Sequence, residues 1–111
     1  ASVIELGNLD VAREFSDVRD VAVIYRLLAE HRPIGETINV CSGQPLSLND
    51  CLSLASEISG HTLGVEVNPA FVRSNEIARL SGDRSKLESL IAAPAPRDFS
   101  ETLRWMIQYP D

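Results

Sequence analysis

The sequence predicts a small α/β domain (mixed α+β) with a short parallel strand pair and about four helices. Two observations predict this class. Residues 37–67 run in the order strand, helix, strand, which favours a parallel pair joined by a right-handed crossover. Segments that begin near residues 17, 83 and 98 each place an acidic residue before apolar residues at helical spacing. Because the chain has 111 residues and 44% are hydrophobic, one domain over residues 1–111 is expected.

The first elements expected are a short strand and a long helix. The strand is the apolar run Val3–Leu6, which precedes the turn-forming residues Gly7 and Asn8. The helix should begin after Asp17, whose carboxylate can accept an otherwise unpaired backbone N–H, and end at Pro33 and Gly35. Its apolar face, at spacings of three and four, consists of Val21, Ile24, Tyr25 and Leu28.

The middle of the chain supplies the strand, helix, strand order. Residues 37–41 (TINVC) are β-branched and apolar and predict a buried strand. A helix should begin after Ser47, with Asp50 as its capping partner, and end at Gly60 in a left-handed conformation. The inner stripe of that helix is Leu48, Cys51, Leu52, Ala55 and Ile58. The second strand of the pair is predicted at residues 63–67.

The last third of the chain begins with a connector and ends in two helices. The connector follows Asn68 and Pro69 and shows neither helical nor strand periodicity. Asp83 can cap a short helix that reaches Leu90, and Asp98 with Glu101 starts the final helix. Residues 92–97 join these helices and are too short to separate domains.

Composition excludes several function classes. A net charge of −6 and a pI near 4.8 argue against a nucleic-acid footprint, and no apolar run is long enough to span a bilayer. Cys41 and Cys51 form neither a zinc pattern nor a disulfide framework, so both are interpreted as small buried thiols in a reducing cytoplasm. His31 and His61 lie near expected helix ends. No nucleophile with a matching base is evident, so the sequence predicts no catalytic residue and no metal site.

Three motifs carry a resemblance to a known family. GNLDVAREFSDVRDVAVIY (7–25), GETINVCSG (35–43) and RSNEIARLSGDRSKL (73–87) occur in order. Together they resemble the C-terminal part of extended short-chain dehydrogenase/reductases, the NAD-dependent epimerase/dehydratase family that acts on nucleotide sugars. Among its members the dehydratases and reductases of GDP-sugars, such as GDP-mannose or GDP-4-keto-6-deoxy-mannose, are the most similar.

The resemblance implies a two-part protein. An N-terminal Rossmann domain would hold NAD or NADP, and a smaller C-terminal domain, represented by this chain, would bind the sugar nucleotide. The chain contains neither a glycine-rich dinucleotide turn nor a Tyr-x-x-x-Lys pair, so the Rossmann domain is missing from it. We therefore expect no cofactor site in these 111 residues and no catalysis by them alone.

The resemblance also implies which residues bind the substrate. Arg73 would contact the nucleotide diphosphate, Glu76 would accept hydrogen bonds from ribose hydroxyls, and Arg13 would be a second diphosphate ligand. Asn8 and Leu9 would approach the base. The chemistry is suitable, because a guanidinium donates a planar fork of N–H groups and a carboxylate is a pure acceptor. The alternative for Arg73 and Glu76 is an exposed ion pair of little consequence.

Two questions stay open at this point. The motifs do not decide between dehydratase, reductase and epimerase, and residues 92–96 (AAPAP) stand where relatives often carry Gly-Trp-x-Pro. A stand-alone interaction module that has lost the catalytic half is the alternative function. In either case, a face left uncovered would favour self-association, so a homo-oligomer is expected.

Overall fold

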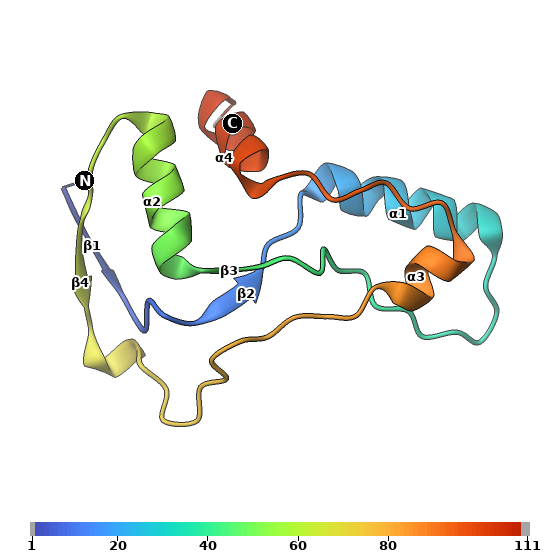
Figure 1. Ribbon diagram of the computed structural model, residues 1–111, viewed down its shortest axis with the longest axis horizontal. Coiled ribbons are helices and arrows are strands. Elements are labelled where there is room, and N and C mark those ends of the chain that lie inside the picture. The colour runs from blue at the N-terminus through green and yellow to red at the C-terminus, as the bar shows by residue number, and fades with distance from the viewer. Residues whose placement is uncertain (1, 110–111) are drawn as a thin grey trace.

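The computed structural model describes residues 2–109, and Figure 1 shows their arrangement. Two strands come first and two helices come last, and between them helices alternate with strands; every strand has only three or four residues. In chain order they are β1 (Val3–Leu6), β2 (Ala12–Glu14), α1 (Val18–His31), β3 (Pro45–Ser47), α2 (Leu48–Ser59), β4 (Gly64–Val67), the 3₁₀ turn η1 (Pro69–Phe71), α3 (Ser85–Leu90) and α4 (Phe99–Gln108). The predicted class, a mixed α/β domain with four helices and a parallel strand pair, is confirmed.

The parallel pair joins β1 to β4, in a register that places Val3 opposite Gly64 and Leu6 opposite Val67. The prediction that residues 37–41 would pair with residues 63–67 is therefore wrong. Residues 37–41 have no strand assignment and no ladder partner within residues 2–109. Side chains from the start of α3 bind two of their carbonyls instead, because Lys86 Nζ donates to Thr37 O at 2.9 Å and Arg84 donates to Cys41 O at 2.9 Å.

A second, antiparallel pair joins β2 to β3, with Ala12 opposite Ser47. The sequence did not predict these three-residue strands. The end of the connector lies along the other edge of β2, since the N–H of Ala12 donates to Ala78 O at 2.8 Å and the N–H of Leu80 donates to Ala12 O at 3.1 Å. The connector is thereby attached to β2 as a third, strand-like segment.

Helix ends follow the local capping signals. Asp17 accepts from the N–H of Arg19 at the start of α1, and Ser47 accepts from the N–H of Asp50 at the start of α2. Gly60 ends α2 in the left-handed conformation, as predicted. Arg32, also left-handed, ends α1.

The last two helices also confirm their predicted positions. Asp83 accepts from both the N–H and the hydroxyl of Ser85, although the residue at the N-cap position of α3 is Arg84. Asp98 occupies the N-cap position of α4 and accepts from the N–H of Ser100 at 3.4 Å.

Few hydrophobic side chains are buried in this fold. Among the described hydrophobic residues only Val11, Ile24 and Leu87 are buried. The radius of gyration is 16.7 Å, whereas a compact domain of this length has about 13 Å. The accessible surface is 7654 Å², against about 6,100 Å² expected for a compact protein of this mass. In Figure 1, α1 and α3 lie at one end, β1, β4 and α2 at the other, and β2, β3 and α4 between them. None of the helices described is long and apolar enough to cross a membrane.

Candidate functional site

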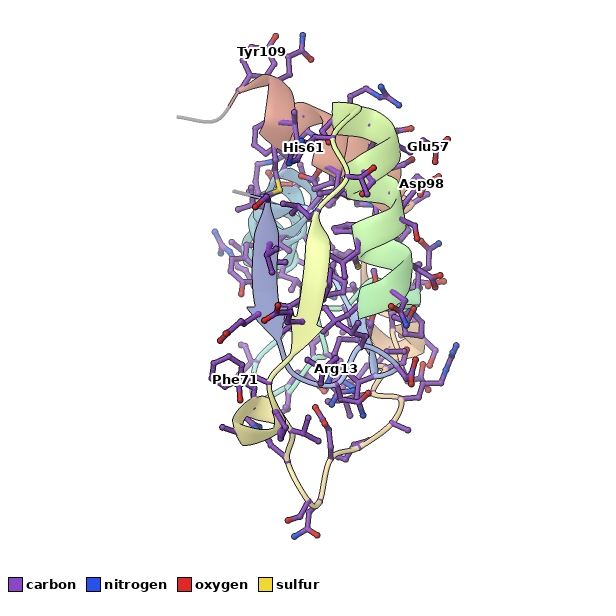
Figure 2. The ribbon with its side chains drawn as sticks, turned by 90° about the vertical axis from the view of Figure 1, so that its left-hand side faces the viewer. Arg13, Glu57, His61, Phe71, Asp98 and Tyr109 are labelled. Atoms are coloured by element: carbon purple, nitrogen blue, oxygen red, sulfur yellow. The ribbon has the colours of Figure 1, made fainter. Side chains whose placement is uncertain are left out.

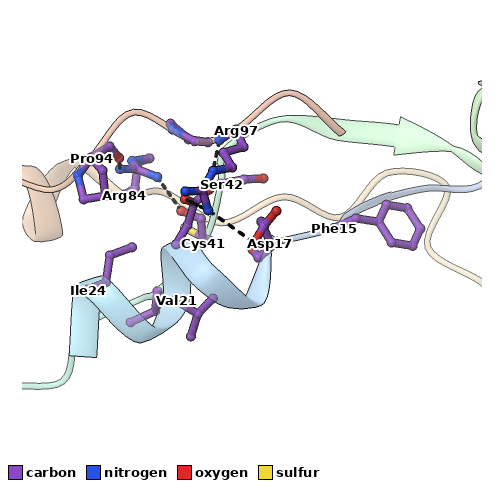
Figure 3. A pocket seen from close by; sticks show the side chains of 13 residues that line it. Phe15, Asp17, Val21, Ile24, Cys41, Ser42, Arg84, Pro94 and Arg97 are labelled. Atoms are coloured by element: carbon purple, nitrogen blue, oxygen red, sulfur yellow. Dashed lines mark hydrogen bonds and ion pairs between the residues drawn. The ribbon is translucent and has the colours of Figure 1, made fainter. Parts of the chain in front are cut away.

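Asp17 is a structural anchor at the start of α1 (Figure 3). Its side chain is buried, and its two oxygens accept from Arg19 at 3.0 Å and 2.8 Å and from the hydroxyl of Thr102 at 2.7 Å. Arg97 approaches the same carboxylate at 3.5 Å. The hydrogen bond from Arg19 is the main reason why the pKa of Asp17 lies well below its ordinary value. Asp17 thus holds α4 and the segment before it against α1.

Two cavities near this anchor contain none of the predicted site residues. The cavity drawn in Figure 3, between α1 and residues 94–97, has a volume of about 10 Å³ and holds at most one water molecule. An open hollow of about 610 Å³ lies between residues 42–44 and residues 91–96. Arg84 lines it, but its guanidinium is committed to Glu88, to the carbonyl of Cys41 and to the carbonyl of Pro94.

A third cavity does contain predicted residues. It has a volume of about 380 Å³ and lies where the β1–β2 turn meets the start of α2 and the start of the connector. Polar groups on its rim are already ordered, since Asn49 donates to the Asp10 carboxylate at 3.0 Å. Apolar walls with a polar rim suit a flat ligand that has a hydrogen-bonding edge. The residues that line it are Asn8, Leu9, Asp10, Asn49, Val67 and Val72.

Among the described residues, Arg13 and Arg73 have no carboxylate partner. Arg13 lies on β2, is half-buried and donates to the carbonyl of Ala12 at 2.8 Å. Arg73 is exposed on the connector, directly after Val72 of the cavity wall. Within residues 2–109, neither guanidinium makes an ion pair. Phe71 is the last residue of η1, directly before the connector. In Figure 2, Arg13 and Phe71 lie toward the same end of the molecule.

Glu76 is half-buried, and one of its carboxylate oxygens, Oε2, is buried without a hydrogen-bond partner. Leaving a buried acceptor unsatisfied costs about 1 to 3 kcal/mol, so such groups point to a missing partner. No bond among the described residues joins Glu76 to Arg13 or Arg73. The attachment of residues 78–80 to Ala12 nevertheless brings the connector against the strand that carries Arg13.

The structure adds residues that the sequence analysis missed. Arg79 is exposed, and its backbone forms an isolated β-bridge with Ala12 on β2, while Asn49 lines the cavity beside Asn8. Glu14 accepts hydrogen bonds from two loops. No local motif marks these residues, because their contacts are with segments that are distant in sequence.

The cysteines are half-buried and free, so the expectation that both are buried is only partly met. Burial is the main cause that raises the pKa of each thiol, and Glu14 adds to it at Cys41 while Asp50 adds to it at Cys51. Within the described residues no group of three or more His, Cys, Asp and Glu side chains could hold a metal ion.

Comparisons with known proteins give the family context. No family model matches the chain. It is 42% identical over 89 residues to GDP-6-deoxy-D-talose 4-dehydrogenase of Aggregatibacter actinomycetemcomitans. These aligned residues make up 79% of this chain and 30% of that protein. The chain is 36% identical over 87 residues to GDP-6-deoxy-D-mannose reductase of Pseudomonas aeruginosa, covering 78% and 29%. The chain therefore spans less than a third of these relatives.

Solved structures agree with the sequence comparison. An epimerase candidate from Burkholderia cenocepacia J2315 matches with a TM-score of 0.94 and 48% identity, over 97% of this chain and 36% of that one. RMD from Pseudomonas aeruginosa, solved with NADPH, matches with a TM-score of 0.86 and 29% identity, over 97% and 36%. In sequence and in fold, the chain belongs to the NAD-dependent epimerase/dehydratase family, of whose members it spans about a third.

Proposed function

We propose that this chain is the nucleotide-sugar-binding part of an NAD(P)-dependent enzyme that acts on a GDP-sugar. The observation that carries the proposal is the sequence identity to two proteins named for GDP-6-deoxy-sugars. Both names describe redox chemistry on the sugar, which favours a dehydrogenase or reductase over a dehydratase or an epimerase. GDP-mannose and GDP-4-keto-6-deoxy-mannose are the model substrates.

The proposed ligand contacts follow from uncommitted groups on neighbouring segments. Arg13 and Arg73 would neutralise the diphosphate, since a guanidinium pairs with phosphate oxygens through two parallel N–H bonds. A ribose hydroxyl would supply the hydrogen bond that Glu76 Oε2 lacks. Asn8 and Leu9 would contact the base from the cavity of about 380 Å³. Because the chain has a net charge of −6, an anionic ligand needs local positive charge, which Arg13 and Arg73 would supply.

The residues of this chain do not fit NAD(P). β1 leads into β2 and β4 leads into the short η1, so neither parallel strand is followed by a glycine-rich turn that opens a helix. Lys86 is the only lysine in the chain, and it is not preceded by a tyrosine at the spacing that proton transfer requires. Cofactor binding and proton transfer are therefore assigned to the rest of the full-length protein, and this chain contributes binding and orientation.

An exposed apolar surface on α1 suits packing against the cofactor-binding part of the full-length protein. On the outer side of α1, an apolar stripe repeats at intervals of three and four residues, and Val18 and Tyr25 on it are 63% and 62% exposed. Ile34, beyond the helix, is 93% exposed. The unpaired segment 37–41 follows. In our proposal this surface packs against the cofactor-binding part, and residues 37–41 pair with its sheet. The stripe consists of Val18, Ala22, Tyr25 and Ala29.

Calorimetric titration of GDP into the full-length protein tests the binding role. Replacing Arg73 or Arg13 with alanine should weaken GDP binding about tenfold or more, because charge-assisted hydrogen bonds to phosphate are lost. Arg26→Ala, an exposed arginine on α1 that pairs with Glu30 at 3.3 Å, is the matched control and should bind as the unmodified protein does. Equal affinity in all three variants would remove the diphosphate role.

A further inference from the structure

The carboxylate of Glu14 is the point where three segments of the chain meet. Oε1 accepts from the hydroxyl of Ser42 at 3.0 Å and from the N–H of Gly43. Oε2 accepts from the N–H of Gly82. One side chain on β2 thus binds the loop after residues 37–41 and the end of the connector. We call these four residues, Glu14, Ser42, Gly43 and Gly82, the Glu14 clamp.

The two glycines of the clamp are required by its geometry. A Cβ on Gly82 would lie 2.8 Å from Cys41 Sγ and 3.3 Å from the Glu14 carboxylate, so the backbone approaches this closely only without a side chain. Gly43 has a φ of +72°, in the left-handed region that favours glycine. Both N–H groups consequently reach one carboxylate.

The clamp is built for an ionised carboxylate. Burial opposes ionisation, but the hydrogen bonds from Gly82, Gly43 and Ser42 outweigh it and lower the pKa of Glu14. A carboxylate has acceptors on both oxygens, whereas a glutamine has only one carbonyl oxygen and would direct an NH₂ group at an N–H. A glutamine cannot therefore hold both loops.

The position of the clamp connects it to the proposed site. Arg13 is the residue before Glu14 on β2, and successive side chains of a strand point to opposite faces. The connector is attached to β2 at residues 78–80 and again at Gly82, just after Arg73 and Glu76. At its other end the N–H of Asn68 donates to Leu6 O at 2.8 Å, and the backbone of Gly7 lies so close to Phe71 that an added Cβ would be 2.7 Å from its carbonyl oxygen. The stretch that carries Arg73 and Glu76 is thus fixed on both sides.

We infer that Glu14 is a positioning residue for nucleotide binding. It holds the end of the connector against β2, so that Arg73 and Glu76 face the same ligand as Arg13. The inference rests on the proposed function. Glu14 itself makes no contact with the ligand, and its effect on affinity passes through the connector.

The test is a double-mutant cycle for GDP binding in the full-length protein, with Glu14→Gln and Arg73→Ala as the single variants. Glu14→Gln should weaken GDP binding about fivefold to tenfold, since one of its two loops is released. In the Arg73→Ala background the same change should weaken binding by less than about twofold, because the residue that the clamp positions has gone. Glu57→Gln, an exposed glutamate on α2 (Figure 2), removes the same charge and should leave the affinity unchanged.

The outcomes separate the two ideas. If Arg73→Ala binds GDP normally, the proposed diphosphate contact of Arg73 fails, whatever Glu14 does. If Arg73→Ala weakens binding but Glu14→Gln does not, or if the two effects are additive, the positioning role is overturned and Glu14 serves only the fold. Should Glu14→Gln fail to fold by circular dichroism, Ser42→Ala replaces it, because it removes one of the three hydrogen bonds and keeps the charge. Ser42→Ala should weaken binding about twofold, again only when Arg73 is present, and unchanged affinity would overturn the role.

Discussion

The N–H of Ala12 donates to the carbonyl of Ala78 at 2.8 Å and so joins β2 to a connector that the sequence leaves without regular structure. This contact is the reason why residues from distant motifs come to lie on neighbouring segments. Arg13 follows Ala12, and Glu76 precedes Ala78 by two residues. Backbone pairing thus places the segment that carries Glu76 beside the strand that carries Arg13.

Asp17 should be the most sensitive polar residue for stability. Asp17→Asn should lower the free energy of unfolding of the 111-residue chain by about 2 to 3 kcal/mol near neutral pH, because the buried carboxylate that Arg19 and Thr102 share is lost. Urea unfolding, followed by the fluorescence of the single tryptophan, Trp105, measures this. Arg19 lies 4.0 Å from the centre of that ring, so the signal reports the same region.

The Asp17 effect should depend on pH in one direction. Because the folded state lowers the pKa below the ordinary value of 3.8, the carboxylate stabilises the fold above that pH, and its contribution is lost as the pH falls through the folded-state pKa. The difference between Asp17→Asn and the unmodified chain should therefore shrink in acid. Asp50→Asn, exposed in the first turn of α2, is the control and should change stability by less than about 0.5 kcal/mol. An Asp17 difference that grows below pH 3.8 would contradict the anchor.

The two cysteines should react slowly. Burial raises the pKa of Cys41 and of Cys51, so the thiolate that attacks iodoacetamide is scarcer than in the unfolded chain. At about pH 8 we expect alkylation at least about fivefold slower in buffer than in urea for each thiol. Mass spectrometry of tryptic peptides gives the rate at each site. Equal rates in buffer and urea would show that the thiols are not protected.

The 111-residue chain should self-associate through the apolar stripe of α1. Tyr25→Glu places a charge in the middle of the stripe and should shift the chain toward monomer, which size-exclusion chromatography with light scattering measures. Tyr109→Glu is the matched control, because Tyr109 is 61% exposed, close to the 62% of Tyr25, but lies beyond α4. A chain that is monomeric at every concentration, or equal behaviour of both variants, would count against this surface.

The sequence predicted well what is encoded locally. Asp17, Ser47 and Asp98 start helices because a capping side chain and its backbone partner lie within three residues of each other. The strands at residues 3–6 and 64–67 were also located, but not their pairing with each other. Strand partners depend on contacts across the fold, which β-propensity does not contain.

Residues 37–41 show most clearly where strand prediction from composition fails. Their β-branched composition indicated a strand, but a strand also needs a ladder partner, and residues 2–109 provide none. Conversely, the strand Ala12–Glu14 contains Arg13 and Glu14 and carried no strand signal at all.

The candidate site was predictable only in part. Arg13, Arg73 and Glu76 followed from the family resemblance, and their roles stay predictions. The Glu14 clamp could not be predicted, because Gly43 and Gly82 lie far from Glu14 in sequence and a glycine gives no sign of which carboxylate its N–H will meet.

A crystal structure of the full-length protein with bound GDP would show directly whether Arg13, Arg73 and Glu76 bind the nucleotide. Arg13 and Arg73 should lie within hydrogen-bonding distance of the diphosphate, and Glu76 should bond to a ribose hydroxyl. GDP bound elsewhere, or bound with these three side chains directed away from it, would contradict the proposed site.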